Sequence, residues 1–324
     1  MKNIVEVENL TKYYKKFRAL NSVSFSVEEG EIFGFLGPNG AGKSTTVRIL
    51  NTLLLPTSGR VFMAGHDLGK EPYEVKARIG LVPEISNPYL ELSCYENLLF
   101  TGRLFGMKNR DIRSEIDNLL DFFELESKRN VKAEFLSKGL RRRLTIAMGL
   151  INRPKLLFLD EPVSGLDIQS ARLIKRLIRE ANEKGTTIFI TTHQLNVAND
   201  LCDRIAIIQD GEIKALDSPD RLKKAAKQSQ AVEIHLDKLK DVDIKELKSL
   251  KTVERVDVNK GKAKLFTEHP EILYPLLISW AEKNNIRIEI MNTLSPTLED
   301  VFIEITGKGF KKGPEGQKKR HKKV

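Results

Sequence analysis

A glycine-rich segment near the N-terminus carries the clearest chemical signal in the chain. Its residues are Gly37, Pro38, Asn39, Gly40, Ala41, Gly42, Lys43, Ser44 and Thr45. This order matches the phosphate-binding pattern GxxxxGK[ST], in which backbone N–H groups surround the phosphates of a nucleotide. Lys43 would reach the β- and γ-phosphates, and the hydroxyl of Ser44 would ligate Mg²⁺. An apolar run enters the loop and a helix-like segment leaves it, which is the setting that this chemistry requires.

A pair of acids provides the second signal. The apolar residues 156–159 lead directly into Asp160 and Glu161. Ligand sites in open α/β sheets lie at the carboxyl ends of strands, so we expect both acids to face the nucleotide. Asp160 would hold Mg²⁺, and Glu161 would act on an attacking water. A strand that ends in two acids is a weak signal alone, and the phosphate loop upstream makes it a strong one.

The order of the remaining elements predicts how these residues are positioned. Apolar runs at residues 32–36, 156–159, 186–191 and 204–208 are typical of buried strands, and residues 171–181 place apolar side chains on one helix face. Alternating strands and helices imply a parallel sheet with right-handed crossovers. The predicted fold class is therefore α/β, a P-loop NTPase with a mixed sheet.

Two further regions extend this core. Residues 4–8 and 22–27 alternate between apolar and polar, which predicts an antiparallel, half-exposed β subdomain. Residues 93–127 and 141–150 have helical spacing, which predicts a helical subdomain over about residues 85–150.

These motifs together resemble the ABC ATPase family over residues 1–220. Leu136-Ser137-Lys138-Gly139-Leu140-Arg141 resembles the signature sequence of that family, commonly Leu-Ser-Gly-Gly-Gln, and departs from it at Lys138 and Leu140. The resemblance implies that two subunits enclose two ATP molecules, each capped by the signature of the opposite subunit. Ser137 would then bond the γ-phosphate from a helix N-terminus, and Gly139 would permit close backbone approach.

The same resemblance assigns four more residues. Asp167 lies in Ser164-Gly165-Leu166-Asp167, similar to the D-loop at the dimer seam. His193 resembles the switch histidine that contacts the γ-phosphate. Tyr14 resembles the aromatic residue that stacks on adenine, with Tyr13 as the competing choice. Glu84 stands where the family usually has glutamine, and its carboxylate remains a suitable Mg²⁺ ligand.

The C-terminal third has a different pattern. Residues 221–230 are polar and predict a linker, and residues 231–306 follow the order βαββαβ, which predicts a small ferredoxin-like α+β domain. Ser295–Phe302 resembles a segment of the ATPases of ABC-2-type exporters, a branch associated with drug and antibiotic resistance. We interpret this domain as regulatory or as a dimer contact.

Residues 307–324 form a basic tail. From Lys308 onward it holds eight Lys or Arg and one Glu, and so carries most of the formal net charge of +10. We expect a solvated, disordered tail. Contact with anionic lipid is a second interpretation, at about 1 kcal/mol per basic residue near the surface, and nucleic-acid binding is the least favoured.

Composition bounds the location and the partners. No apolar run approaches the ~20 residues of a bilayer span, and no signal sequence opens the chain. The two cysteines are too far apart for a CxxC pair and are expected to be reduced. Together with the resemblance to ABC ATPases, which implies a membrane partner, this composition leads us to expect a cytoplasmic protein, peripheral on the inner face of the cell membrane. The resemblance also implies a multi-span permease and a second ATPase subunit as partners, with a homodimer favoured and a heterodimer left open. The alternative is a soluble ABC ATPase acting on ribosomes or DNA.

Overall fold

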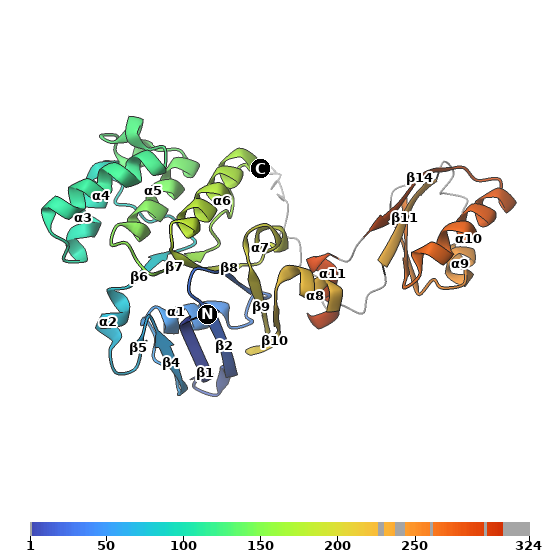
Figure 1. The fold of residues 1–324 in the computed structure, drawn as a ribbon, viewed down its shortest axis with the longest axis horizontal. Coiled ribbons are helices and arrows are strands. Elements are labelled where there is room, and N and C mark those ends of the chain that lie inside the picture. The colour runs from blue at the N-terminus through green and yellow to red at the C-terminus, as the bar shows by residue number, and fades with distance from the viewer. Residues whose placement is uncertain (1, 226–229, 237–243, 260–261, 295–296, 307–324) are drawn as a thin grey trace, which may run out of the picture. The chain divides into compact units, whose positions relative to one another are not determined.

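The computed structural model describes residues 2–225, 230–236, 244–259, 262–294 and 297–306 (Figure 1). The chain divides into two compact units, Met1–Pro219 and Asp220–Val324. The predicted tail at 307–324 and part of the predicted linker lie outside the described residues.

A six-stranded sheet forms the centre of the first unit. Its strand order is β10-β9-β3-β8-β7-β6, with every neighbouring pair parallel except β9 and β10. The strands are β3 (Ile32–Leu36), β6 (Ile79–Val82), β7 (Leu156–Asp160), β8 (Thr187–Thr192), β9 (Arg204–Gln209) and β10 (Glu212–Asp217). All residues of β3 and β8 are buried, as expected for strands covered on both faces. The predicted mixed sheet is confirmed.

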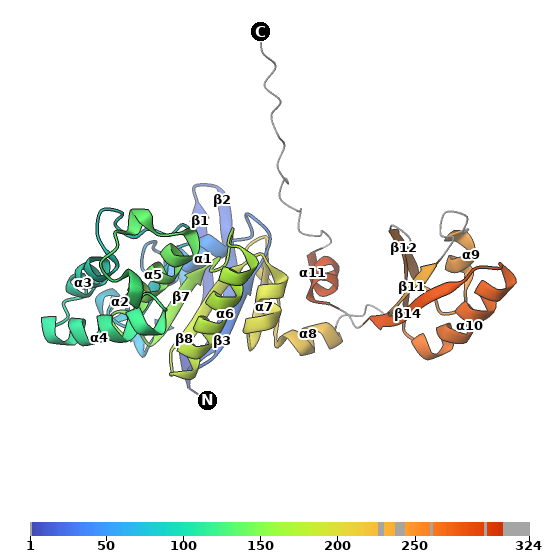
Figure 2. The same cartoon turned by 90° about the horizontal axis from the view of Figure 1, so that it is seen from above.

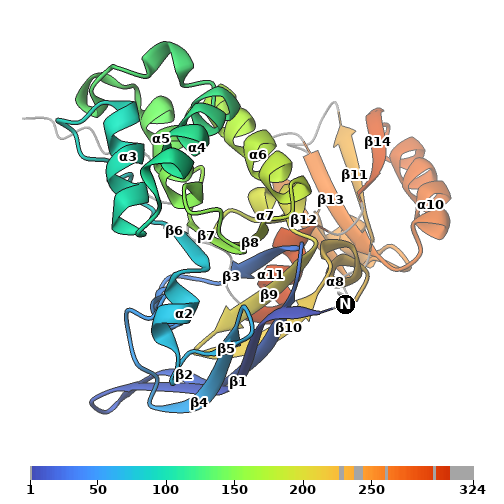
Figure 3. The ribbon, with the colours of Figure 1, turned by 60° about the vertical axis from the view of Figure 1, so that its left-hand side comes forward.

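An antiparallel sheet and one helix cover the first face. The sheet has the order β2-β1-β4-β5, built from β1 (Asn3–Tyr14), β2 (Phe17–Glu28), β4 (Ser58–Met63) and β5 (His66–Asp67). Figure 3 shows this antiparallel sheet on the side of the unit away from α3, α4 and α5. Helix α1 (Lys43–Leu50) packs with both sheets in one hydrophobic core, through Val47, Ile49 and Leu50. Phe25, Phe33, Phe35, Phe158 and Phe189 pack together there, with ring centroids 5.2–6.2 Å apart. This aromatic core holds the strand that feeds the phosphate loop rigidly in place.

Helices cover the other face and the β6 edge. Helices α3, α4 and α5 gather beyond that edge, and α6 and α7 lie against the sheet (Figures 1 and 2). The helices are α2 (Pro72–Lys76), α3 (Cys94–Leu104), α4 (Asn109–Phe122), α5 (Lys138–Leu150), α6 (Ile168–Glu183) and α7 (Leu195–Leu201), with short 3₁₀ turns at Glu126–Lys128 and Ala133–Phe135. Ser93 begins α3 with a reciprocal capping box, in which Glu96 N–H donates to the Ser93 hydroxyl and Ser93 N–H donates to the Glu96 carboxylate.

The second unit contains a four-stranded antiparallel sheet of order β12-β13-β11-β14. Its elements are α8 (Pro219–Ala225), β11 (Gln230–Leu236), α9 (Ile244–Ser249), β12 (Arg255–Asn259), β13 (Lys262–Thr267), α10 (Pro270–Lys283), β14 (Ile288–Leu294) and α11 (Leu298–Thr306). The βαββαβ order and the central pair β11 and β13 match the ferredoxin-like arrangement. Its separate core includes Val232, Ile234, Leu265, Leu277 and Trp280.

Several boundaries differ from the sequence-based expectation. Helix α1 begins at Lys43, inside the phosphate loop, and α5 begins at Lys138, three residues before the expected helical segment at 141–150. Residues 79–82 form β6, a strand that the sequence analysis does not predict. Strands of four residues give too short a pattern to be recognised without their neighbours.

Within the described residues, no helix combines the length and the hydrophobicity that a membrane crossing needs.

Candidate functional site

The phosphate loop lies in a cavity of about 450 Å³ at the carboxyl end of the six-stranded sheet. The predicted residues that line it are Tyr14, Asn39, Gly40, Gly42, Lys43, Ser44, Thr45, Glu84, Asp160, Glu161 and His193. They come from the ends of β1, β3, β6, β7 and β8 and from the start of α1. The structure therefore brings residues that are far apart in sequence into one place.

Glycine is required at two positions of the loop for different reasons. A Cβ atom on Gly37 would lie 2.3 Å from the carbonyl oxygen of Ile208, so only glycine lets β9 approach this closely. Gly42 has a φ of +113°, and a Cβ atom there would lie 2.7 Å from the side chain of Leu20. Between them, Ala41 N–H donates to the carbonyl oxygen of Pro38 at 3.2 Å, which curls the loop.

Lys43 folds back over this loop. Its ammonium donates to the carbonyl oxygens of Gly37 at 2.6 Å and Pro38 at 3.1 Å. Burial lowers the pKa of Lys43, and the carboxylates of Glu161, Asp160 and Glu84 oppose that shift. Among the described residues that line the cavity, Lys43 is the one Lys or Arg beside three carboxylates, so it is the side chain there that would bind an anionic ligand.

Glu161 is held by the end of β8. Thr192 donates its hydroxyl to one carboxylate oxygen at 3.0 Å, and the backbone N–H of His193 donates to the other at 2.8 Å. The imidazole Nδ1 of His193 lies 2.5 Å from that second oxygen. The backbone of Glu161 has a φ of +44°, a left-handed conformation that costs roughly 1–2 kcal/mol for a side chain with a Cβ. Strain of this kind persists where the surroundings fix the residue, as they do here.

Asp160 and Glu84 supply further oxygen atoms to the cavity. Asp160 accepts a short hydrogen bond from the hydroxyl of Thr191, the residue paired with it on β8. Glu84 follows β6 and is exposed at the cavity wall. With the hydroxyl of Ser44, these groups form an all-oxygen donor set of the type that Mg²⁺ prefers, so the residues fit that ion.

Two aromatic side chains stand at the outer end of the cavity. Tyr14 lines it, whereas Tyr13 is not among the lining residues. Phe17 also lines the cavity and is largely exposed. It was missed because an isolated phenylalanine after a strand has no distinguishing pattern in the sequence. The ammonium of Lys12 lies 5.6 Å from the centroid of the Tyr14 ring.

Arg142 was also missed. It is buried below the cavity edge and donates to the backbone carbonyl oxygens of Asp160 at 2.8 Å and Glu161 at 3.2 Å. Burial lowers its pKa to about 10, an effect that the charges of Asp160, Glu84 and Glu161 oppose. The sequence shows three consecutive arginines, and nothing in it indicates which one is buried.

Ser137, Gly139 and Asp167 do not belong to this cavity. They lie at the starts of α5 and α6, where Ser137 caps α5 and Asp167 caps α6. A Cβ atom on Gly139 would lie 2.6 Å from the hydroxyl oxygen of Ser170, so the two helix starts touch. We call the group Ser137, Lys138, Gly139 and Asp167 the signature surface; Gly139 is half-buried, and the other three are exposed.

Lys138 joins the two halves of the signature surface. Its ammonium donates to the carbonyl oxygen of Gly165 at 2.8 Å. Asp167 accepts from the backbone N–H of Ser170 at 2.9 Å and from its hydroxyl at 2.7 Å, and these bonds lower the pKa of Asp167. The polar groups of this surface are therefore fixed by bonds within the chain and lie exposed outside the cavity.

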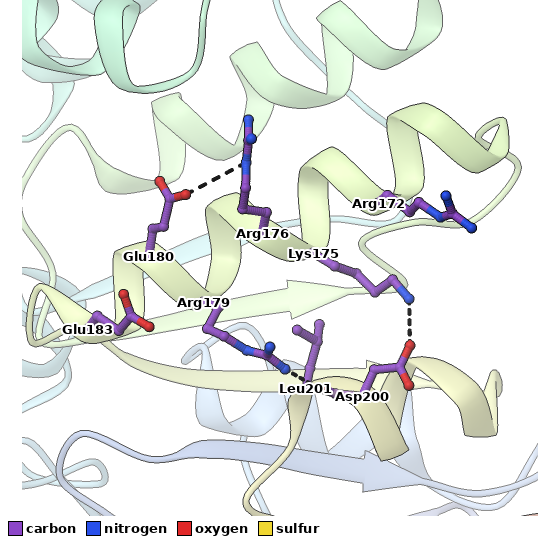
Figure 4. Close-up of a pocket in the computed structure, with 8 residues that line it drawn as sticks. All are labelled: Arg172, Lys175, Arg176, Arg179, Glu180, Glu183, Asp200 and Leu201. Carbon is purple, nitrogen blue, oxygen red and sulfur yellow. Dashed lines mark hydrogen bonds and ion pairs between the residues drawn. The ribbon is translucent and has the colours of Figure 1, made fainter.

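A separate hollow of about 610 Å³ lies beside α6 and α7 (Figure 4). Four basic residues of α6 line it, but acidic neighbours engage several of them. Lys175 pairs with Asp200 at 2.6 Å, and Arg176 pairs with Glu180 at 3.6 Å. We regard this hollow as a solvated, internally paired surface.

Comparison with known proteins gives consistent matches. The family described as ABC transporter matches residues 20–164. The linearmycin resistance ATP-binding protein LnrL of Bacillus subtilis (strain 168) is 32% identical and covers 94% of this chain and 99% of its own length. The Nod factor export ATP-binding protein I of Rhizobium sp. (strain N33) is 36% identical and covers 95% and 98%. A solved dimeric ATP-binding cassette with bound ADP and Pi has a TM-score of 0.60 at 31% identity, covering 66% of this chain and 98% of its own.

Proposed function

This chain belongs to the ATP-binding proteins of ABC transporters, and from that premise we propose that its cavity hydrolyses Mg-ATP to drive a separate membrane-spanning exporter. One observation carries the proposal. Glu161 is fixed by Thr192 and His193 in the same cavity as Lys43 of the phosphate loop. A fixed carboxylate beside a phosphate-binding cation is the arrangement that water attack on a γ-phosphate needs.

Each residue of the cavity has a distinct role in this proposal. The backbone of Gly37–Gly42 and the ammonium of Lys43 bind the phosphates, and Tyr14 stacks on the base. Glu161 orients and polarises the attacking water, and His193 contacts the γ-phosphate. Both groups act by position and charge, which supply most of the catalysis in phosphoryl transfer.

Ser44, Asp160 and Glu84 would hold Mg²⁺. Bound there, the ion would supply positive charge to the β- and γ-phosphate oxygens.

The signature surface completes the site in a dimer. We propose that Ser137, Gly139 and Asp167 of one subunit face the nucleotide held by the other. The support is that Ser137 and Asp167 are exposed, that the three residues lie together, and that none of them lines the cavity of its own chain. A homodimer is the simpler form, because one chain contains both halves.

An apolar surface after β6 is suited to the membrane partner. Ile85, Tyr89 and Leu90 are exposed, with Ile85 80% accessible. Their backbone is nevertheless fixed, because the buried Asn97 accepts from Tyr89 N–H at 2.7 Å and donates to the carbonyl oxygens of Tyr89 at 3.0 Å and Leu92 at 3.1 Å. Exposed apolar groups on a fixed backbone are typical of a docking surface. This surface follows Glu84 directly, so movement of the partner would be transmitted to the cavity.

The names of the relatives concern resistance and export, which supports an exporter. The C-terminal unit would act in regulation or dimer contact, and the chain would work at the inner face of the membrane, with its basic tail near anionic lipid.

Affinity capture tests the transport partner. Tagged protein is purified from gently solubilised native membranes, and co-purifying proteins are identified by mass spectrometry. We expect a multi-span membrane protein with the wild type and its loss with Ile85→Asp. Tyr73→Ser is the matched control, because Tyr73 is an equally exposed apolar residue on α2. Recovery of ribosomes or DNA-repair proteins in place of a membrane protein would reject the transport role.

A further inference from the structure

Arg142 lies on α5 and is buried, with 3% of its surface exposed. Its guanidinium donates to five backbone carbonyl oxygens, those of Pro83, Glu84, Asp160, Glu161 and Pro162. The bond to Pro83 is short, and the other four span 2.8–3.2 Å. A guanidinium has five N–H donors in a fixed plane, so each donor has an acceptor here.

These carbonyls belong to two segments that end at the cavity. Pro83 and Glu84 follow β6, and Asp160, Glu161 and Pro162 end or follow β7. Since β6 and β7 are adjacent parallel strands, their carboxyl ends lie side by side, and Arg142 bridges them from below. One side chain thus joins α5 to the backbone of both Glu84 and Glu161.

We propose that Arg142 is a positioning residue that fixes the Glu161 carboxylate relative to Glu84 through the planar geometry of its guanidinium. This assignment rests on the proposed hydrolysis of ATP. The backbone of Glu161 is left-handed, with a φ of +44°, and strain of this kind persists where the surroundings hold the residue. Arg142 holds that carbonyl, while Thr192 and His193 hold the carboxylate of the same residue.

Ser137 and Arg142 are connected through helix α5. Ser137 caps the helix that carries Arg142, so the Ser137 half of the signature surface and the Arg142 side chain belong to one helix. Because the Arg142 guanidinium bonds to the carbonyl oxygens of both Glu84 and Glu161, a displacement of α5 would move these two residues together.

The neighbouring arginines are engaged elsewhere. Arg141 donates to the carbonyl oxygens of Glu134 at 3.2 Å and Leu136 at 3.3 Å. Arg143 donates to the carbonyl oxygen of Phe123 at 3.0 Å and pairs with the carboxylate of Glu124 at 3.2 Å. Arg143 is therefore a matched control that stands on the same helix and bonds outside the cavity.

The test compares Arg142→Lys, Arg142→Gln and Arg143→Gln with the wild type. Steady-state phosphate release gives kcat and the KM for ATP, and a magnesium titration gives the apparent Mg²⁺ requirement. Binding of a fluorescent ATP analogue and the thermal unfolding midpoint report whether each variant is folded.

We expect both Arg142 variants to lose about 100-fold in kcat, because small displacements of a catalytic group have effects of that order. The KM for ATP should stay within about threefold, since Arg142 touches neither the phosphate loop nor Tyr14. The Mg²⁺ requirement should rise, because Glu84 is released as well. Lysine should not rescue, since it keeps the charge but loses the planar fork. Arg143→Gln should keep kcat within about threefold of the wild type.

Three outcomes would overturn the assignment. Wild-type kcat in Arg142→Lys would mean that only the charge matters. If Arg143→Gln lost as much kcat as the Arg142 variants, the effect would come from disturbing helix α5 and not from the bonds of Arg142. Loss of nucleotide binding or folding in both Arg142 variants would make the residue purely structural. If the wild type itself hydrolyses no ATP, the proposed function fails, whereas an active wild type with unaffected Arg142 variants rejects this inference alone.

Discussion

The cavity and the signature surface hold their polar side chains in place in different ways. In the cavity, Glu161 and Asp160 accept bonds from residues of the neighbouring strand, so separate strand ends support one another. On the signature surface, Ser137 and Asp167 bond to the first turns of their own helices. The cavity is assembled by the sheet, and the signature surface by local capping.

This difference indicates which part of the proposed ATP site a single chain can form. The cavity contains the loop, the acids and the histidine, and it needs no second copy to position them. The signature surface is equally well ordered, but its groups point at nothing in their own cavity. The proposed dimer, which places one surface over the other cavity, would account for both. Three predictions separate the contributions of the two regions, and a fourth concerns residues outside them.

The largest effect is expected in the cavity. Glu161→Gln should reduce the hydrolysis rate by roughly 10²- to 10⁴-fold, the contribution of a positioned general base. ATP binding should persist, because Lys43 and the loop are unchanged. Phosphate release and binding of a fluorescent nucleotide measure the two quantities. Glu8→Gln, at an exposed position of β1, is the control and should behave as the wild type. Undiminished turnover in Glu161→Gln would remove Glu161 from its proposed role.

A smaller effect on the rate is expected at the signature surface. Ser137→Ala should lower hydrolysis roughly 10- to 100-fold, since a hydrogen bond to a charged group contributes about 1.5–3 kcal/mol. Binding of nucleotide to the dilute, isolated chain should not change, because Ser137 lies outside the cavity. Loss of the cap should also reduce the free energy of unfolding by about 1 kcal/mol. A weakened affinity in the dilute chain would contradict the division between the two regions.

Alanine substitutions at the glycines of the two regions should have different effects on the free energy of unfolding. Gly37→Ala places a methyl group against the backbone oxygen of Ile208, and it should reduce the free energy of unfolding by roughly 1–3 kcal/mol. Gly139→Ala meets the hydroxyl oxygen of Ser170 at 2.6 Å and its Cβ atom at 3.2 Å. The hydroxyl can rotate away at the expense of its bond to Asp167, so this variant should change that free energy less, by about 1 kcal/mol or less. Urea unfolding of the two variants provides the comparison. Equal destabilisation would show that the signature surface is packed as tightly as the sheet.

The smallest effect concerns the cysteines, which lie in neither region. Burial raises the pKa of Cys94 to about 11 and raises that of Cys202 further. At pH 8 both thiols are neutral and enclosed, so a thiol reagent should modify neither in the folded protein. Both should react after denaturation, which serves as the control. Rapid modification of the native protein would indicate that the core around them opens.

The sequence was sufficient to predict the cavity residues that stand at the ends of parallel strands. Lys43, Asp160, Glu161 and His193 follow apolar runs, and parallel strands bring such ends to one edge. Arg142 and Phe17 could not be identified this way. The burial of one arginine among three depends on how α5 packs against the ends of β6 and β7, and that packing has no local pattern.

The contact between Lys138 and Gly165 restricts how the chain can vary. A Cβ atom at position 165 would lie 2.4 Å from the Lys138 ammonium, and Gly165 itself has a positive φ of +63°. A side chain at 165 therefore requires a shorter residue or a different rotamer at 138, while loss of Lys138 frees position 165 from one of its two constraints. Position 165 is therefore expected to accept a side chain more readily once Lys138 is replaced, and a library that varies position 165 alone will underestimate what the fold accepts.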